Sequence, residues 1–302
     1  MKYPSYLNLS KKEWQKRIKK SESLLNPCRL CPRKCGVNRL ADQKTGFCQM
    51  GNSPVVSSFN AHFGEERCLV GFGGSGTIFF TSCNLACVYC QNFEISQLRL
   101  GDEVTIKHLA EMMIILQQKG CHNINFVSPT IWVPQIIKAL AKAIDGGLNI
   151  PLVYNTGGYD SVETLKLLYG IFDIYMPDIK YSNDKIGEKY SLAPNYWTQA
   201  QKVVKEMYHQ VGDLIINKNG LAKKGLLIRH LVLPNNLAGT KKVMRFLAKQ
   251  ISKATYVNIM AQYYPTNKAY QYPEISRRIT KEELNQALKI AKNLGINRLD
   301  KP

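Results

Sequence analysis

The sequence contains no apolar run of the roughly 18 residues that a membrane-spanning helix needs. Its most apolar stretch, residues 225–233, is interrupted by Arg229 and His230. The first 20 residues are polar and basic, and they lack the apolar segment of a secretory signal. Internal repeats and low-complexity tracts are also absent, while 45% of the residues are hydrophobic and 21% are charged, the balance of a folded protein. We therefore expect a folded cytoplasmic protein that has no membrane as a partner.

Acidic residues are scarce, since the 302 residues include 22 acidic and 41 basic side chains, a formal net charge of +19. The basic excess lies at the two ends: residues 1–50 carry 12 basic and 3 acidic side chains, and residues 201–302 carry 19 and 6. Such charge can attract RNA, but no RNA-recognition motif or series of stacking aromatics accompanies it. A solvated, lysine-rich surface is the simpler interpretation, and RNA stays open as an alternative partner.

Cysteine, by contrast, is abundant. Nine cysteines, an odd number, in a reducing compartment indicate metal or redox chemistry rather than disulfides. Cys68 and Cys121 stand apart from the others and are interpreted as small buried hydrophobic residues. The rest form two groups, Cys28, Cys31, Cys35 and Cys48 in one and Cys83, Cys87 and Cys90 in the other.

From residue 77 onward, short stretches rich in β-branched or aromatic residues alternate with amphipathic stretches. Six strand-then-helix units predict a parallel sheet, either doubly wound or an incomplete barrel, with ligands at the carboxyl ends of the strands. The predicted strands are 77–80, 123–127, 152–155, 173–176, 226–233 and 256–260. The predicted helices lie around 109–116, 136–144, 200–207 and 284–291, with Ser161 and Thr240 as N-caps of two more and a capping box at Thr280 and Glu283.

The three-cysteine group lies in TIFFTSCNLACVYCQN, directly after the first predicted strand. Thiolates are the usual ligands of iron–sulfur clusters. Three of them on one tight loop can hold three irons of a four-iron cluster and leave the fourth iron open for a substrate or cofactor. A structural zinc ion, which prefers four ligands, or three incidental buried cysteines are the alternatives.

The spacing C-x3-C-x2-C, with the aromatic Tyr89 before the last cysteine, resembles the signature of the radical S-adenosylmethionine (SAM) superfamily. The resemblance implies a partial (β/α)6 barrel, which agrees with the six units counted above. It also implies a [4Fe-4S] cluster held by Cys83, Cys87 and Cys90, with SAM bound to the open iron. Reductive cleavage of SAM then gives a 5′-deoxyadenosyl radical that abstracts hydrogen, so the implied activity is that of an oxidoreductase.

Several further segments together resemble homologues of pyruvate formate-lyase activating enzyme that carry an N-terminal four-cysteine module. That resemblance implies anaerobic work, a one-electron reductant of flavodoxin or ferredoxin type, and the glycine of a separate glycyl radical enzyme as the substrate. The segments are CRLCPRKCGVNRL, GFGGSGTIFFTSCNLACVYCQN, DIYMPDIKY, YSLAPNYW, RHLVLPN and MAQYYP.

Five residues are candidates for binding the cofactor. In the activating enzymes an Asp-x-Lys after the fourth strand contacts SAM, and Asp178 and Lys180 match it in place and type. Arg229 stands in the fifth strand where those enzymes have an arginine, and a charge within an apolar strand favours a position facing a ligand. Tyr89 of the cysteine loop and Asn155, which ends the third strand, are the other two candidates. His230, on the opposite face from Arg229, is interpreted as a structural histidine.

The sequence departs from the family pattern at two places. The superfamily's Gly-Gly-Glu after the second strand is replaced by residues 127–130, Val-Ser-Pro-Thr, so backbone carbonyls or Thr130 would have to contact the amino group of SAM. The histidine that activating enzymes place after their sixth strand is replaced by Tyr264.

The four-cysteine group has the spacing C-x2-C-x3-C-x12-C. Four thiolates make a closed site, which suits either a structural zinc ion or a second iron–sulfur cluster, and a structural role is expected. We predict that residues 1–70 form a basic helix and this four-cysteine module, and that residues 71–302 form the core domain. An RNA-modifying radical SAM enzyme and a non-enzymatic iron–sulfur electron carrier are the alternative functions.

Overall fold

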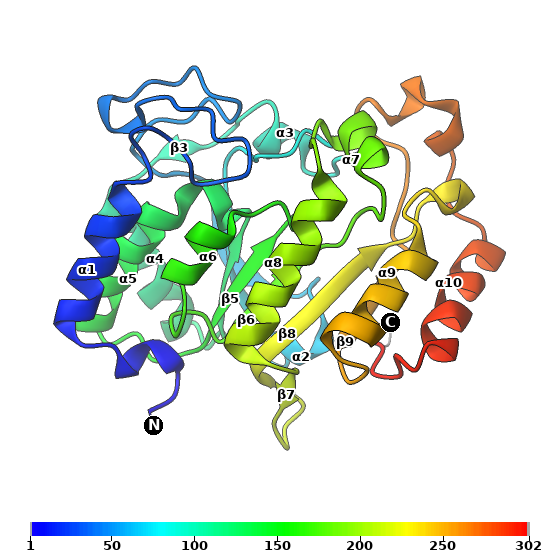
Figure 1. Cartoon of the computed structure of the whole chain (residues 1–302). Coiled ribbons are helices and arrows are strands. Elements are labelled where there is room, and N and C mark those ends of the chain that lie inside the picture. The colour runs from blue at the N-terminus through cyan, green and yellow to red at the C-terminus, as the bar shows by residue number, and fades with distance from the viewer. Residues whose placement is uncertain (1, 301–302) are drawn as a thin grey trace.

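Six strands of the computed structural model run parallel, paired in the order in which they occur along the chain (Figure 1). The structure describes residues 2–300; Met1, Lys301 and Pro302, at the outer ends of the two predicted domains, lie outside that range. The prediction of six parallel strands is confirmed, with strand ends that differ by up to four residues. The strands are β2 (Ser75–Phe80), β4 (Ile124–Val127), β5 (Leu152–Thr156), β6 (Ile174–Pro177), β8 (Ala222–Leu231) and β9 (Tyr256–Met260).

The parallel sheet forms a partial barrel, because within residues 2–300 its outer strands β2 and β9 do not pair with each other. Instead, β1 (Val55–His62) pairs antiparallel with β2 and with β3 (Asp102–Glu103), and β7 (Ile215–Ile216) pairs antiparallel with β8. The sequence pattern did not predict β1. This strand places residues 55–62 on the edge of the core sheet, and the domain boundary at residue 70 stays a prediction.

Helices connect the strands and cover the outer face of the sheet. The four predicted helices are present, and the capping box of Thr280 and Glu283 opens the last of them. The prediction of Thr240 as an N-cap is wrong by one residue: Gly239, with φ +68°, precedes the helix, and Thr240 is its first residue. Ser161 occupies an N-cap position, but its side chain makes no capping bond. The helices are α1 (Lys11–Glu22), α2 (Arg67–Val70), α3 (Phe93–Ser96), α4 (Ile106–Gln118), α5 (Val133–Asp145), α6 (Val162–Leu167), α7 (Asp184–Ser191), α8 (Tyr196–Val211), α9 (Thr240–Phe246) and α10 (Lys281–Asn293).

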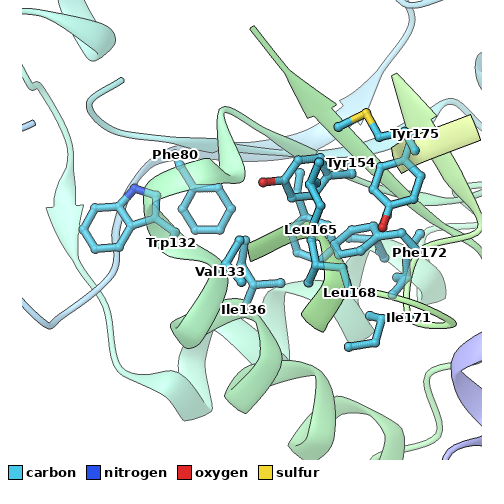
Figure 2. Packing of buried hydrophobic residues seen from close by; sticks show 14 of the residues in the cluster. Phe80, Trp132, Val133, Ile136, Tyr154, Leu165, Leu168, Ile171, Phe172 and Tyr175 are labelled. Carbon is cyan, nitrogen blue, oxygen red and sulfur yellow. The ribbon is translucent and has the colours of Figure 1, made fainter. Parts of the chain in front are cut away.

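The main core lies between the sheet and these helices (Figure 2). Successive side chains of a strand point to opposite faces, so every second residue of β5 and β6 faces the helices. Tyr154 and Tyr175 do so, with ring centroids 5.7 Å apart, and Phe172 packs against both. At the other end of this layer, Phe80 stacks on Trp132 with centroids 6.3 Å apart.

A second, smaller apolar cluster fills the barrel interior below the carboxyl ends of the strands. The short helix α2 supplies Cys68 and Leu69 to it, and the inward-facing residues of three strands supply most of the rest. Cys68 is 4% exposed, as expected of a small buried residue. Because α2 occupies the lower interior, the space that remains lies at the carboxyl ends. The strand residues of this cluster include Val153, Ile174, Met176 and Leu227.

The four-cysteine module rests on the core through the fully buried Arg39. Its guanidinium donates two hydrogen bonds to the Gly51 carbonyl, at 3.0 and 2.8 Å, and one to the Ile131 carbonyl at 2.7 Å. It also lies 5.1 Å from the ring centroid of Trp132. Helix α1 runs beside α5 (Figure 1). The module is therefore held at a fixed place on the core.

Candidate functional site

The loop that follows β2 carries the three-cysteine group, and hydrogen bonds hold each sulfur in place. The hydroxyl of Ser191 donates to Cys87 Sγ at 2.9 Å, the amide of Leu85 donates to Cys83 Sγ at 3.4 Å, and Cys90 Sγ lies 3.2 Å from Ser96 Oγ. Burial raises the pKa of Cys83 to about 12 and that of Cys87 to about 11. These thiols are therefore protonated at neutral pH in the metal-free protein, and binding a metal would release their protons.

The structure brings seven of the predicted site residues around one cavity of about 160 Å³ at the carboxyl ends of the strands. The three cysteines come from the loop after β2, and the other four residues come from β5, from β8 and from the segment that follows β6. The seven residues are Cys83, Cys87, Cys90, Asn155, Asp178, Lys180 and Arg229.

The donor set suits an iron–sulfur cluster better than a single metal ion. Among the described residues, no three His, Cys, Asp or Glu side chains are gathered so as to hold one ion. In a four-iron cluster each thiolate binds a different iron, so the sulfurs do not need to converge on one point. Three soft thiol donors on the lining of one cavity, with no fourth cysteine among the described residues that line it, fit a cluster that keeps one iron open.

Asp178 is the centre of a buried ionic network on the lining of the same cavity. Its two carboxylate oxygens accept hydrogen bonds from Lys180 Nζ at 2.5 Å and from Arg229 Nε at 2.8 Å. Arg229 Nη2 also donates to Asn155 Oδ1 at 2.6 Å. The three charged side chains are only 13–18% exposed, so this is not a surface ion pair. Four of the five predicted cofactor-binding residues thus form one hydrogen-bonded unit.

The electrostatics of this network keep all three groups charged. Burial alone would raise the pKa of Asp178, but Arg229 and Lys180 outweigh burial and hold that pKa below its usual range. Burial alone would lower the pKa of Lys180, and Asp178 reverses that effect and raises it. A carboxylate, an ammonium and a guanidinium side by side can together bind a zwitterionic amino acid group.

Tyr196 and Gly158 position the network, and the sequence assigned neither a role. The hydroxyl of Tyr196, on α8, lies 2.9 Å from the Gly157 carbonyl and 3.1 Å from the Asp178 carbonyl, and it accepts from the amide of Lys180 at 3.0 Å. Gly158 has φ +77°, and a Cβ there would lie 2.1 Å from the Asp178 carbonyl oxygen. Only glycine allows this turn to close beneath Asp178.

Glu65 is a further site residue that the sequence pattern missed. Its side chain is 9% exposed and reaches Arg229 Nη1 at 3.4 Å, while Asn155 Nδ2 donates to it at 3.5 Å. Burial raises the pKa of Glu65, partly offset by Arg229. The sequence offered little to indicate a role for Glu65, because this residue follows β1, the strand that the apolar pattern did not predict.

A larger cavity of about 420 Å³ adjoins the smaller one and shares Cys87, Cys90 and the ionic network with it. Its lining includes His62, from the end of β1, and Met260, from the end of β9. Strand β1 flanks β2 at one edge of the parallel sheet and β9 is the other edge, so residues from both sides of the gap in the barrel line this cavity.

Tyr89 lines this larger cavity rather than the smaller one. Its hydroxyl donates to Tyr181 at 2.5 Å, the Tyr181 hydroxyl lies 2.7 Å from Ser191 Oγ, and Ser191 donates to Cys87 Sγ. Tyr89 therefore reaches the cysteine wall through two hydroxyl groups, and its ring packs edge-on against Tyr263.

Three expectations about neighbouring residues are now decided. Thr130 cannot serve a cofactor, because its buried hydroxyl donates to Asp160 at 2.7 Å on the helix side of the sheet. Val127 and Ser128 do line the smaller cavity.

Tyr264 is 37% exposed, beneath the guanidinium of Arg278, and lines neither cavity. The interpretation of His230 as structural holds: it is fully buried, its ring bonds the Ile179 carbonyl at 2.7 Å, and burial lowers its pKa to about 4.

The four thiols of the N-terminal module share one neighbourhood. The pKa of Cys28 is raised by burial and further by Cys35 and Cys48. Burial, Cys48 and Cys28 raise the pKa of Cys31 to about 12. Cys28, Cys31 and Cys48 are buried, and Cys35 is exposed.

No helix within residues 2–300 is long and apolar enough to cross a membrane.

A partial parallel barrel with a three-thiol loop after its first parallel strand and an ionic cavity at the carboxyl ends defines a radical SAM domain. Residues 77–216 match the radical SAM superfamily. Over 293 residues, 93% of this chain, the sequence is 36% identical to the uncharacterized protein MJ0674 of Methanocaldococcus jannaschii, of which it covers 79%. The chain belongs to the radical SAM superfamily, whose members are enzymes that use a [4Fe-4S] cluster and SAM.

Among solved structures, the chain is similar to the crystal structure of HydG, a maturase of the [FeFe]-hydrogenase. The TM-score is 0.51 at 11% sequence identity, over 97% of this chain. The chain spans 64% of the length of HydG. At this identity the likeness shows the fold alone, and it agrees with the partial barrel.

Proposed function

We propose that the protein is a radical SAM oxidoreductase in which Cys83, Cys87 and Cys90 hold the [4Fe-4S] cluster. The observation that carries this proposal is the single cavity that these three thiols share with Asp178, Lys180 and Arg229. A [4Fe-4S] cluster held by these three thiols would supply the one-electron reduction on which SAM cleavage depends.

The chain's own residues bind and orient the cofactor. Lys180 and Arg229 offer cationic donors to the carboxylate of SAM, and Asp178 offers an acceptor to its amino group. Asn155 fixes the guanidinium of Arg229, and the backbone of residues 127–128 provides carbonyl acceptors in place of the absent Gly-Gly-Glu. Leu85 and Phe80, on the lining of the smaller cavity, keep water from the reacting groups.

The substrate side is the larger cavity at the gap in the barrel. We propose, as in pyruvate formate-lyase activating enzymes, that a glycine-bearing loop of a glycyl radical enzyme enters there. A cavity of about 420 Å³ between two sheet edges has room for a short peptide segment beside the ionic network. A flavodoxin or ferredoxin type protein would supply the electron, since radical SAM enzymes depend on an external reductant. Cytoplasmic, anaerobic work remains the expectation.

The test is an anaerobic assay of the reconstituted protein with SAM and titanium(III) citrate, in which 5′-deoxyadenosine is quantified. We expect product in the wild type and none in Cys87→Ala. Cys121→Ala is the matched control, because Cys121 is equally buried but lies in the helix-side core. Cluster formation without SAM binding would refute the proposal in favour of an electron carrier, and SAM cleavage stimulated by RNA would favour the RNA-modifying alternative.

A further inference from the structure

Asp160 is a fully buried carboxylate on the helix side of the sheet, behind the smaller cavity. Three hydroxyl groups donate to it: that of Thr156 reaches Oδ2 at 2.7 Å, and those of Thr130 and Tyr154 reach Oδ1 at 2.7 and 2.9 Å. Burial raises the pKa of Asp160, and the three hydroxyls partly offset that effect. Because a buried carboxylate is costly without hydrogen bonds, these donors and Asp160 hold one another in place.

Two of the three donors stand beside the smaller cavity. Thr130 belongs to the loop after β4 (residues 128–130), which begins on the cavity lining, and Thr156 ends β5 and lines the cavity itself. Each hydroxyl has one proton and directs it to Asp160, so the two threonines, whose oxygens lie 3.2 Å apart, do not bond each other. Asp160 itself lies on the loop after β5 (residues 157–161). Its side chain therefore joins these two loops.

The loop after β4 contains a backbone conformation that needs support. Ser128 has φ +57°, in the left-handed region that a serine rarely adopts. Its amide donates to the Asn155 carbonyl at 2.9 Å, and two residues later Thr130 donates to Asp160. Such a conformation persists where surrounding contacts over-determine it. Release of Thr130 would therefore let residues 127 and 128, which carry the proposed carbonyl acceptors, relax away from the cavity.

The loop after β5 is the firmer of the two, because it contacts three other parts of the site. Gly157 lies against Leu85 of the cysteine loop, so closely that a Cβ there would lie 2.7 Å from Leu85 Cδ1. The carbonyl at the end of β5 accepts from the amide of Asp178 at 2.9 Å. From α8, Gln199 donates to the carbonyl of Asp160 at 2.7 Å. Asp160 thus stands on a fixed support to which the loop after β4 is attached.

We propose that Asp160 is a positioning residue that clamps the loop after β4 to the loop after β5 and so keeps the SAM cavity in its binding shape. This inference rests on the proposed function, because it takes the smaller cavity to be the SAM site. Asp160 is not on the lining of that cavity and acts through Thr130 and Thr156. Without the superfamily's Gly-Gly-Glu, the loop after β4 offers backbone acceptors, and this clamp fixes their position.

Thr130→Val removes one arm of the clamp with little change in volume, and Tyr154→Phe is the matched control. Both hydroxyls donate to the same oxygen of Asp160, but Tyr154 packs in the core among aromatic rings, away from the cavity loops. Each variant therefore loses one hydrogen bond to the same carboxylate, and urea unfolding should show a similar loss of stability.

The affinity for SAM, measured by calorimetry on the reconstituted proteins, should separate the two variants. We expect Thr130→Val to bind SAM about tenfold more weakly than the wild type, the contribution of one hydrogen bond to a charged group. Tyr154→Phe should bind SAM as the wild type does. Thr130→Ser, which restores the hydroxyl, should restore the affinity.

Asp160→Asn tests the clamp from its other side. It should also weaken SAM binding, and adding Thr130→Val to it should cause little further loss, because both changes break the same contact. Losses that multiply in the double variant would contradict the clamp.

Hydrogen exchange without SAM provides a second measurement that does not depend on the cofactor. The amides of residues 126–132 should exchange severalfold faster in Thr130→Val than in the wild type and Tyr154→Phe. Unchanged exchange there, wild-type SAM affinity in Thr130→Val, or an equal loss of affinity in Tyr154→Phe would overturn the proposal. If the wild type itself does not bind SAM, the proposed function fails, and hydrogen exchange still decides whether Asp160 clamps the loop.

Discussion

Replacing Arg229 by methionine tests whether the ionic network is as buried and as interdependent as the structure indicates. Arg229 contacts Asp178 at 2.8 Å, Asn155 at 2.6 Å and Glu65 at 3.4 Å. In Arg229→Met, Asp178 keeps Lys180, whereas Glu65 loses the guanidinium and keeps neutral amide groups, those of Asn155 at 3.5 Å and Asn125. The variant therefore leaves one buried carboxylate, that of Glu65, without the guanidinium that partly compensates its charge.

The expected loss in the free energy of unfolding follows from the partners that Asp178 and Glu65 keep in the variant. Removing one member of a buried ion pair costs about 3–5 kcal/mol, and the value should lie near the lower end because Asp178 stays paired. For a chain of this length that corresponds to a fall of about 5 °C in Tm. The exposed pair of Arg277 and Glu283 provides the control, and Arg277→Met should lose less than about 1 kcal/mol.

The pH dependence of this stability loss tests whether the buried charge of Glu65 causes it. Burial already raises the pKa of Glu65, and loss of Arg229 raises it further. A carboxyl whose pKa is raised on folding binds more protons in the folded state, so the protein gains stability as the pH falls toward that pKa. Urea unfolding at pH 7.5 and pH 5.5 should therefore show a smaller deficit of Arg229→Met at pH 5.5.

The double variant Arg229→Met/Glu65→Gln should regain about half of the loss or more at pH 7.5, because the uncompensated charge is gone. The reasoning is refuted if Arg229→Met loses less than about 1 kcal/mol, if its deficit is the same at both pH values, or if Glu65→Gln restores nothing.

Three further predictions concern the same region. Gly158→Ala should weaken SAM binding at least tenfold, because the added Cβ would displace Asp178. Calorimetry on the reconstituted protein measures the affinity. Gly120→Ala is the control and should leave SAM binding unchanged, because Gly120 has a similar φ but no atom within 4 Å of the added Cβ. Lys180→Met should keep the SAM-binding cluster and lower the affinity for SAM about 10- to 100-fold, which is what one hydrogen bond to a charged group contributes. A variant with wild-type affinity would contradict the role assigned to Lys180. Burial lowers the pKa of His230 to about 4 in the folded protein, so between about pH 6.5 and pH 4 the histidine is protonated in the unfolded chain but not in the folded one. The free energy of unfolding therefore falls as the pH drops below about 6.5, by up to about 3 kcal/mol. A His230→Gln variant should lose that part of the acid sensitivity, and an unchanged pH profile of urea unfolding would count against it.

The barrel was predictable because its signals are local. Six short apolar runs alternate with helical periodicity, and each run became a strand within a few residues of its predicted bounds. The thiol loop was predictable for the same reason, since its spacing lies within eight residues. The strand β1 was missed because it lies outside the parallel strands, where its side chains are only partly buried and the apolar alternation is weak.

Side-chain direction was the part that local pattern could not decide. Thr130 was a candidate cofactor contact because it stands in the segment that replaces the family's Gly-Gly-Glu, but its hydroxyl donates to Asp160 on the helix side. Tyr264 looked like the residue that replaces a family histidine, yet its neighbour Tyr263 faces the cavity. A difference of one residue or one turn reverses the direction of a side chain, and only long-range packing fixes it.

The sequence by itself determined the parallel core and the three-thiol loop, because each depends on spacing along the chain, whereas most of the cofactor-binding candidates came from the resemblance to a known family. The tertiary structure decided that Asp178, Lys180, Arg229 and Asn155 form one network, that Glu65 joins it, and that Cys48 rests on Ser82. These contacts join residues 34 to 164 positions apart, apart from the local pair of Asp178 and Lys180. Which residues meet in these contacts depends on the register of the strands and on how the module packs on the core. A short segment of sequence contains neither kind of information.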